Sequence, residues 1–496
     1  MPKKVVISIV VVAAIAAIIF VFLTQCENKI ETTSTSYITA SDDARDYWAL
    51  IPEGFTTNDE YFPINLRFES TDTVVEVYCE NLKNEFRNAY INYTNEAITK
   101  NNTDYFNIKQ LTQDDYQILS WNRNKLSKIE NDKNHYVKID TIHTDSVQTM
   151  LIKSANPIND YTVYIPLFDV AANYTVPDKT FVKKEASHRS FNEETQKFYS
   201  DVFENPDNLS WGIFHPDYMK NDSLAKIEDE IDHKFEYALW YVGFTEEYIP
   251  HKIEGFLERA YSDGKIAELT LQNVPTHKSG NELFRLLNGD YDRFLDGCAK
   301  AIADFKHPVM LRIGNEMNGD WCEYSGYRMS LDTELYREMY RYIFSYFEKH
   351  GANNVVWIWN PNGKSFPDYK WNSEEMYYPG NEYVDVLGLT LYNTGTYYEG
   401  EEWTEFSELY TPLYENAVKK YDMPFMITEF SCARMGGDKE AWTRKMLSEI
   451  HTFKQIKLAV WWSNADFAPN GDISRAYYID DSKEMKSIFK EYFNKY

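Results

Sequence analysis

The chain has 496 residues, 43% of them hydrophobic and 26% charged, so it is long enough for two or three domains and too apolar to be disordered throughout. With 51 Lys and Arg against 77 Asp and Glu the net charge is −26, which would repel a phosphate backbone and excludes nucleic acid as an expected partner. Aromatic residues make up 16% of the chain, a composition suited to surfaces that stack on flat apolar faces such as those of sugar rings. The 5 Cys residues are too few for a disulfide framework, and no spacing indicates a metal site.

An apolar run at residues 5–23, interrupted only by Ser8, predicts a membrane segment. At about 1.5 Å per helical residue it can cross a hydrocarbon core of about 30 Å. Lys3 and Lys4 precede it, so the positive-inside rule predicts that the rest of the chain lies outside the cytoplasm. The run is longer than a cleaved signal peptide requires, and we therefore predict that residues 1–26 form an uncleaved anchor.

The alternative is a lipoprotein, because residues 23–26 resemble a lipobox that ends in an acylated Cys26. Gln25 departs from that motif, which normally has a small residue before the cysteine, so the anchor is the favoured prediction. Either arrangement predicts an extracytoplasmic protein tethered to the cell membrane. Residues 27–43 are rich in Ser, Thr and Glu and are predicted to be a flexible tether.

Residues 44–186 contain short β-like runs separated by turns rich in Asn and Asp. We predict a β-rich accessory domain with a β-sandwich as its architecture, and two roles are open for it, a spacer or a sugar-binding module. Residues 187–206 are polar and are predicted to be a linker to the next domain. The clearest β-like runs of the accessory domain are 74–78, 135–139, 146–150 and 161–165.

From residue 207 to residue 496, eight apolar runs alternate with amphipathic stretches such as 292–305, 331–349 and 439–453. Strands that are apolar on both faces and alternate with helices indicate a parallel sheet, and eight such units predict a (β/α)8 TIM barrel, an α/β fold. A doubly wound open sheet is the alternative, but no Gly-rich nucleotide loop follows an early strand. The predicted strands are 211–214, 235–242, 266–271, 309–313, 355–359, 384–389, 425–428 and 458–462.

Two glutamates follow strands of this predicted barrel, where the chemistry of such folds is found. Glu316 comes just after the fourth strand and Glu429 at the end of the seventh. Hydrolysis of an acetal needs a proton donor for the leaving oxygen and a second carboxylate for the oxocarbenium-like carbon. Two glutamates from different strands that face one crevice could supply both.

The segment 312–321, with the sequence RIGNEMNGDW, is the most specific motif of the barrel region. Together with the segments 357–362, 377–393, 423–430 and 460–463, it makes residues 207–496 resemble glycoside hydrolase family 26, whose best-known members are β-mannanases. The resemblance implies a retaining mechanism with Glu316 as the acid/base and Glu429 as the nucleophile. It also implies that no metal or organic cofactor is needed.

The same resemblance assigns four further residues to the substrate site. Arg312 is expected beside the nucleophile, and Tyr392 is expected to donate a hydrogen bond to it. Trp321 is expected to contact the substrate, and Trp461 is expected to form the floor beneath the sugar at the cleavage point.

Asn315 departs from the family, which usually has His directly before the acid/base. Other families of the same clan carry Asn there, where it donates to the 2-hydroxyl of the sugar, so hydrolysis is expected to survive while mannan specificity is weakened. Trp357 and Trp359 lie two apart and share one face of a strand, and Trp359, nearer the strand end, is predicted to be a sugar platform.

The sequence therefore predicts a membrane-tethered, endo-acting glycoside hydrolase that cuts a β-linked polysaccharide, mannan or a related β-glycan. A monomer is expected, with the polysaccharide and the membrane as its partners. The alternative is a non-catalytic carbohydrate-binding or envelope-organising protein that keeps the barrel as a scaffold.

Overall fold

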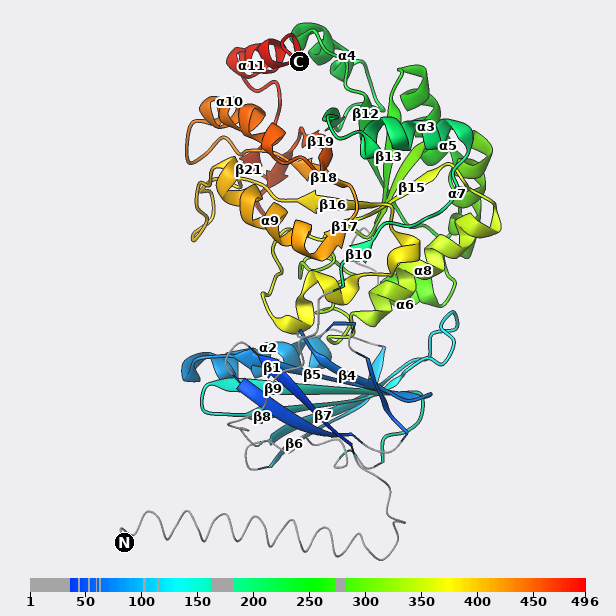
Figure 1. Cartoon of the computed structure of the whole chain (residues 1–496), viewed down its shortest axis with the longest axis vertical. Coiled ribbons are helices and arrows are strands. Elements are labelled where there is room, and N and C mark those ends of the chain that lie inside the picture. The colour runs from blue at the N-terminus through cyan, green and yellow to red at the C-terminus, as the bar shows by residue number, and fades with distance from the viewer. Residues whose placement is uncertain are drawn as a thin grey trace, which may run out of the picture.

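The computed structural model describes residues 36–42, 45–51, 54–58, 60–61, 64–100, 104–113, 116–159, 161, 182–272 and 282–496. Figure 1 shows a barrel of strands and helices with a smaller antiparallel sheet packed beneath it. Within these ranges no helix is long and apolar enough to cross a membrane. The predicted anchor at 5–23, Cys26 and all but the first residue of the strand predicted at 161–165 lie outside the described residues.

The N-terminal domain is one seven-stranded antiparallel sheet in the order β3-β4-β5-β9-β8-β7-β6. The predicted runs 74–78, 135–139 and 146–150 fall in β5, β8 and β9, so the β-rich character of this region is confirmed. The strands are β3 (Thr56–Asn58), β4 (Leu66–Glu69), β5 (Thr73–Asn81), β6 (Tyr105–Gln113), β7 (Tyr116–Arg123), β8 (His135–Ile142) and β9 (Ser146–Ser154).

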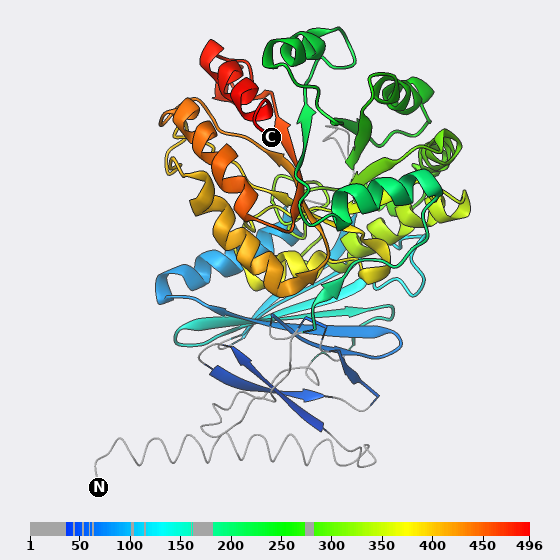
Figure 2. The same cartoon turned by 45° about the horizontal axis from the view of Figure 1, so that its top comes forward.

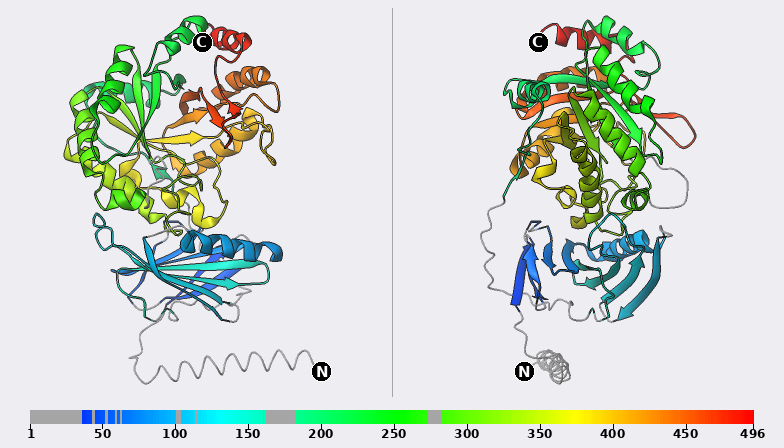
Figure 3. Two further views of the ribbon diagram at one scale, coloured as in Figure 1. Left: turned by 180° about the vertical axis from the view of Figure 1, so that it is seen from behind. Right: turned by 90° about the vertical axis from the view of Figure 1, so that its right-hand side faces the viewer.

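The predicted β-sandwich is wrong in its details, because a helix covers one face of this sheet. Helix α2 (Asn84–Thr99) lies between the sheet and the barrel, as Figure 1 and both views of Figure 3 show. Its buried side chains recur at the helical spacing of one amphipathic stripe, which packs on the sheet. These side chains are Tyr90, Ile91, Thr94, Ala97 and Ile98.

A separate two-stranded antiparallel sheet precedes this domain. It consists of β1 (Ser36–Asp42) and β2 (Arg45–Ile51). The second half of the segment predicted as a flexible tether is thus a strand, because residues 36–42 pair along their whole length with residues 45–51.

The barrel is closed by eight parallel strands in the order β11-β12-β13-β14-β15-β16-β18-β19, and all eight predicted strands are present. Figure 2 shows the strands surrounded by helices. The strands are β11 (Ser210–Phe214), β12 (Tyr237–Gly243), β13 (Ile266–Gln272), β14 (Val309–Ile313), β15 (Val355–Trp359), β16 (Val386–Thr390), β18 (Phe425–Phe430) and β19 (Ile456–Trp462).

The predicted amphipathic stretches form three of the helices around the barrel, α7, α8 and α10. Two short strand pairs decorate the barrel: β10 (Lys184–Glu185) with β17 (Tyr421–Asp422), and β20 (Ala465–Phe467) with β21 (Ile473–Ala476). The α-helices are α4 (Ser223–Ile231), α5 (Pro250–Ser262), α6 (Glu282–Leu287), α7 (Asp292–Phe305), α8 (Glu334–Lys349), α9 (Phe406–Lys420), α10 (Lys439–Glu449) and α11 (Lys483–Phe493). Short 3₁₀ turns span Lys370–Asn372 (η3), Glu374–Tyr377 (η4), Asn381–Tyr383 (η5) and Ile450–Thr452 (η6).

The segment 187–206, predicted to be a linker, is instead a plug beneath the barrel. It contains helix α3 (Glu193–Tyr199) and the π-helical turn η2 (Ser200–Glu204). Their apolar side chains pack against inward-facing residues near the N-terminal ends of the strands, so the lower mouth of the barrel is closed. The plug consists of Phe198, Tyr199, Val202 and Phe203, which pack with Tyr237, Leu239, Met310, Val356, Val386, Met426 and Leu458.

Candidate active site

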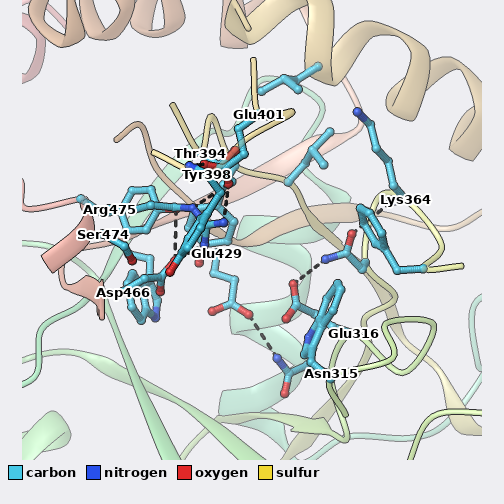
Figure 4. A pocket seen from close by; sticks show the side chains of 18 of the residues that line it. Asn315, Glu316, Lys364, Thr394, Tyr398, Glu401, Glu429, Asp466, Ser474 and Arg475 are labelled. Carbon is cyan, nitrogen blue, oxygen red and sulfur yellow. Dashed lines mark hydrogen bonds and ion pairs between the residues drawn. The ribbon is translucent and has the colours of Figure 1, made fainter. Parts of the chain in front are cut away.

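A cleft of about 1160 Å³ opens at the C-terminal ends of the barrel strands. Both predicted catalytic residues, Glu316 and Glu429, line it. In Figure 4 the two carboxyl groups face the same space, with Lys364 to one side and Asp466 and Arg475 to the other. The structure therefore brings the two glutamates together, and the cleft continues past them in both directions.

A β-bulge in β18 turns Glu429 into this cleft. Ile427 pairs with Ala459 of β19 and Phe430 pairs with Trp461, so β18 has one residue more than its neighbour between these pairs. Ile427 and Phe430 pack outward against the helices. The extra residue lets both Thr428 and Glu429 face inward, as bulges beside active sites often do.

The Glu429 carboxylate accepts hydrogen bonds from three neighbours, and the residue is only 4% exposed. Arg312 Nη1 donates to its Oε1 over 3.0 Å, and Asn315 Nδ2 donates to the same oxygen over 3.2 Å. The hydroxyl of Tyr241, on β12, donates to Oε2. One cation and two neutral donors thus match the negative charge and fix the orientation of the group.

Arg312 is completely buried beside Glu429, the location that the sequence predicts for it. Its Nε donates to Thr270 Oγ1 and its Nη1 to Asn360 Oδ1, each over 2.8 Å. These contacts to β13 and to the end of β15 hold the guanidinium rigidly, so its charge is aimed at the carboxylate.

Glu316 has a different environment, with no hydrogen-bonded cation among the described residues. Asn362 Nδ2 donates to its Oε1 over 2.8 Å, and its own N–H donates to Asn360 O over 2.8 Å. Its backbone has a φ of 58°, a left-handed conformation that costs a non-glycine residue about 1–2 kcal/mol. Burial and, next, the negative charge of Glu429 raise the pKa of Glu316 to about 7. Of the two glutamates that line the cleft beside Arg312 and Trp321, Glu316 is therefore the one that can carry a proton near neutral pH.

Trp321 lies on the cleft near Glu316 and is 46% exposed, so the structure places it where the sequence predicts a substrate contact. Its ring packs on Phe366 with the centroids 5.4 Å apart. A Cβ at Gly319 would lie 2.4 Å from Trp321 Cζ2, so the glycine lets the ring fold back over the backbone. Two aromatic side chains therefore form one wall of the cleft.

The prediction that Trp461 lies in the cleft is wrong, and its neighbour Trp462 is the one that lines the cleft. Trp461 is completely buried outside the barrel, where it packs on Phe489 of α11 and donates from Nε1 to Tyr477 O. Trp462 lines the cleft and stacks on Phe214 with the centroids 5.4 Å apart. Adjacent strand residues point to opposite faces, so choosing the wrong one of the pair reverses the side.

The prediction that Trp359 is a sugar platform in the cleft is also wrong. Its side chain is completely buried and packs on Tyr378 and Tyr421, outside the barrel. Trp357 shares this outward face, whereas Val356 and Ile358 point into the barrel. Neither tryptophan of β15 can touch a substrate in the cleft.

The predicted hydrogen bond from Tyr392 to Glu429 belongs to Tyr241 instead. Tyr392 lines the cleft and packs edge-on against Trp462, with the centroids 6.1 Å apart. Sequence reasoning missed Tyr241 because residues 235–242 are apolar on both faces, so nothing in the pattern says which alternate residues point inward.

Asn315 lies on the cleft, as predicted, but its amide is already engaged with Glu429. Its backbone carbonyl accepts a hydrogen bond from the Tyr324 hydroxyl over 2.7 Å. Glu429 thus holds the side-chain amide of Asn315, and Tyr324 holds its backbone.

On the opposite wall of the cleft, Arg475 of β21 connects two segments of the chain. Its Nη1 donates to Asp466 over 2.8 Å and its Nε donates to Glu401 over 2.9 Å. The guanidinium also lies 4.9 Å from the centre of the Tyr398 ring. These contacts join the β20–β21 pair to the loop after β16 and present exposed Phe467 and Tyr398 beside the cleft. Sequence reasoning did not find this wall, because it forms between segments about 70 residues apart.

The described ranges contain no group of three or more His, Cys, Asp or Glu side chains arranged to hold a metal ion. The cleft presents two carboxyl groups in contrasting surroundings together with aromatic side chains. This arrangement can perform acid/base and nucleophilic chemistry on a ligand with flat apolar faces.

The chain is similar in amino-acid sequence to known proteins. Endoglucanase H of Acetivibrio thermocellus is 28% identical over 243 residues, covering 48% of this chain and 25% of that protein. A mannan endo-1,4-beta-mannosidase of Bacillus subtilis is 28% identical over 278 residues, covering 51% of this chain and 73% of that protein. The chain thus spans only a quarter of the length of the first relative.

Among solved structures, an endo-beta-1,4-mannanase of Cellulomonas fimi aligns over 63% of this chain and 76% of its own, with 17% identity and a TM-score of 0.47. A beta-mannanase of Bacteroides ovatus aligns over 61% of this chain and 93% of its own, with 16% identity and a TM-score of 0.46. The sequence profile described as glycosyl hydrolase family 26 matches residues 196–454, just over half of the chain. The family resemblance predicted from the barrel motifs is confirmed, and the chain belongs to glycosyl hydrolase family 26.

Proposed function

We propose that this protein is an endo-acting glycoside hydrolase that cuts a β-linked polysaccharide with retention of configuration. The observation that carries the proposal is the contrast between Glu429, whose charge is matched by Arg312, and Glu316, whose pKa is raised to about 7. A retaining glycosidase needs one ionised carboxylate and one protonated carboxyl group on the same cleft.

In the first step Glu429 attacks the anomeric carbon while Glu316 donates its proton to the leaving glycosidic oxygen. The product is a covalent glycosyl ester on Glu429 and one half of the cut chain. Glu316, now ionised, then removes a proton from water, and the resulting hydroxyl attacks the same carbon and releases Glu429. Arg312 and Tyr241 hold the nucleophile in position throughout.

The shape of the cleft supports cleavage within a polymer chain. Aromatic residues lie on both sides of the carboxyl groups, with Trp321 and Phe366 on one wall and Tyr398 and Phe467 on the other. Such side chains stack on sugar rings. A cleft that continues beyond the catalytic pair in both directions can hold several sugar units on either side of the bond.

For the substrate we propose mannan or a related β-1,4-glycan, because the relatives include mannan endo-1,4-beta-mannosidases and an endoglucanase. The test measures new reducing ends and loss of viscosity with mannan, β-glucan and xylan, and follows the first anomer released by proton NMR. Release from at least one polymer, with the β-anomer formed first, is the expected result. Binding without release from any polymer would instead support the non-catalytic scaffold, and an α-anomer would exclude retention.

The acidity of Glu316 predicts the pH dependence of the reaction. Because Glu316 must be protonated to assist the leaving group, kcat/KM should fall as the pH rises through about 7. An aryl glycoside with a good leaving group needs no proton, so its kcat/KM should not show this decline. Initial rates of both substrates between pH 4 and pH 9 provide the measurement. A decline centred near the ordinary pKa of Glu, about 4.3, would contradict the assignment.

The two adjacent tryptophans of β19 provide a matched pair of variants. Trp462→Ala removes a ring that lines the cleft and should lower kcat/KM by about tenfold or more. Trp461→Phe alters a side chain buried against α11, so it should lower Tm while leaving kcat/KM nearly unchanged. Steady-state kinetics and thermal unfolding of both variants make the comparison, and equal kinetic losses would contradict the inward location of Trp462.

We further propose that the enzyme is tethered outside the cytoplasm by residues 5–23. The proposal depends on the sequence of that segment, which lies outside the described residues. Intact-mass measurement of the protein from membranes is the test. A chain that retains Lys3 and Lys4 supports the anchor, a chain that begins at an acylated Cys26 supports the lipoprotein, and an unlipidated chain that begins later excludes both.

A further inference from the structure

The loop that carries Glu316 and Trp321 is long and has no regular structure of its own. It covers residues 314–333, between the end of β14 and the start of α8. On the barrel side the loop is held chiefly at Asn318, which exchanges hydrogen bonds with Asn362 and accepts one from Asn372, and the Gly326 N–H donates to the Tyr377 hydroxyl over 2.9 Å. Structureless loops of this length are uncommon inside compact domains and often carry function.

Helix α2 of the N-terminal domain touches this loop close to the cleft. The Tyr93 hydroxyl donates to Asp320 Oδ2 over 3.4 Å, and Asp320 directly precedes Trp321. The Tyr93 ring also packs on Tyr327, with the centroids 4.6 Å apart. One side chain of the accessory domain therefore contacts the loop on both sides of Trp321.

The end of the same loop is held by buried charges of the N-terminal sheet. Asp332 accepts hydrogen bonds from Lys153 Nζ over 2.8 Å and from the Tyr136 hydroxyl over 2.9 Å. Lys153 also pairs with Glu76 over 3.1 Å, and all of these groups are buried. A buried ion pair is tolerated only in one well-matched geometry, so this contact fixes where the loop meets the sheet.

A second loop of the cleft is supported in the same way. Glu80 at the end of β5 accepts a hydrogen bond from the Lys370 N–H over 2.5 Å, in the turn that follows Phe366. The Phe366 N–H in turn donates to Asn318 O over 2.8 Å. The N-terminal domain thus braces both loops that form the aromatic wall of the cleft.

This packing engages the accessory domain with the barrel. Tyr78 and Tyr90 are completely buried, and Tyr93 is engaged with the barrel loop, so none of these rings is free to stack on a sugar. One continuous cluster of buried residues includes side chains from both domains. A spacer would not share a core with the barrel.

We infer that the N-terminal domain is a positioning part of the active site, which holds the loop of Glu316 and Trp321 in its working geometry through Tyr93. The inference rests on the proposed glycosidase function for its kinetic consequences, but not for its structural ones. Tyr93 touches no substrate and acts through the loop. Misplacement of a catalytic group by about 1 Å can cost about 100-fold in rate, so a braced loop has a direct effect on turnover.

The test uses the full chain with three variants of helix α2. Tyr93→Ala removes the ring and the hydroxyl, Tyr93→Phe keeps the ring, and Phe86→Ala is the matched control because Phe86 is 54% exposed on the same helix. The first readout is hydrogen exchange of peptides that cover residues 316–329. Exchange should rise with Tyr93→Ala, rise less with Tyr93→Phe and stay at the wild-type rate with Phe86→Ala.

The second readout is kinetic, and it separates a loss of proton donation by Glu316 from a general loss of activity. Tyr93→Ala should lower kcat on the cleaved polysaccharide by about tenfold or more, and should affect an aryl glycoside with a good leaving group much less. Unchanged exchange in Tyr93→Ala, or equal losses on both substrates, would overturn the inference. If hydrogen exchange of the loop rises in Tyr93→Ala as expected but the wild type cuts no glycan, the positioning role of the N-terminal domain is supported and the proposed function is excluded.

Discussion

Glu429→Gln is expected to reduce turnover by about 10⁴-fold or more while the barrel stays folded. The amide keeps the shape of the side chain but cannot attack the anomeric carbon. Arg312 keeps its hydrogen bonds to Thr270 and Asn360, so the guanidinium is not left without partners. The assay measures the release of reducing ends. It uses enough enzyme to detect about 10⁻⁵ of the wild-type rate, since losses of roughly this size are known for missing nucleophiles.

Some loss of stability should accompany this change, because a buried cation loses its carboxylate. Breaking one partner of a buried pair costs about 3–5 kcal/mol, which thermal unfolding will register. Glu415→Gln, at an exposed position of α9, is the matched control and should change neither rate nor stability. A Glu429→Gln enzyme with more than a few per cent of wild-type turnover would remove Glu429 from the nucleophile role.

Glu316→Gln is expected to slow hydrolysis of the polysaccharide by about 10²- to 10⁴-fold, because the amide cannot donate the proton that the leaving oxygen needs. Asn362 can still donate to the remaining carbonyl oxygen, so the loop should keep its conformation. An aryl glycoside with a good leaving group should still form the glycosyl ester on Glu429. A burst of aryl alcohol followed by slow turnover is the signature to measure, since the second step also needs Glu316.

Two results would contradict this role of Glu316. One is an equal loss of the burst rate on both substrates, which would indicate a role in binding. The other is an unchanged decline of activity above pH 7 in the variant, because that decline is assigned to the Glu316 proton. Either result would indicate that another group of the cleft donates the proton.

Much of the fold could be predicted from the alternation of apolar and amphipathic runs. All eight barrel strands were found because buried parallel strands are continuous apolar stretches, and both glutamates were found because they follow such strands. Helix α2 was missed because its polar face dominates its composition and only the stripe from Tyr90 to Ile98 is buried. The plug at 193–204 was missed because a segment with four apolar anchors among charged residues looks like a linker when taken alone.

The site errors have one physical origin. A barrel strand is apolar on both faces, so the sequence does not reveal which alternate residues point inward. For this reason the sequence does not distinguish Trp462, which lines the cleft, from Trp461, which the family resemblance selects, and it gives no sign that Trp359 points outward or that Tyr241 points inward. Strict alternation would also have misdirected Glu429, which reaches the cleft only through the bulge in β18.

The plug beneath the barrel determines where the chain can be cut. A fragment that starts at residue 207 would lack Phe198, Tyr199, Val202 and Phe203 and would open the lower mouth of the barrel to water. Met310, Val356, Val386 and Met426, all almost completely buried in the intact chain, would then form an exposed apolar surface. Aggregation of such a fragment would therefore report the loss of these buried contacts, together with those of the N-terminal domain, and not a defect of the catalytic cleft at the opposite end. Recombinant dissection of the two domains has to place its boundary before Lys184, because β10 pairs with β17 and the Ser187 N–H donates to Val384 O of the barrel.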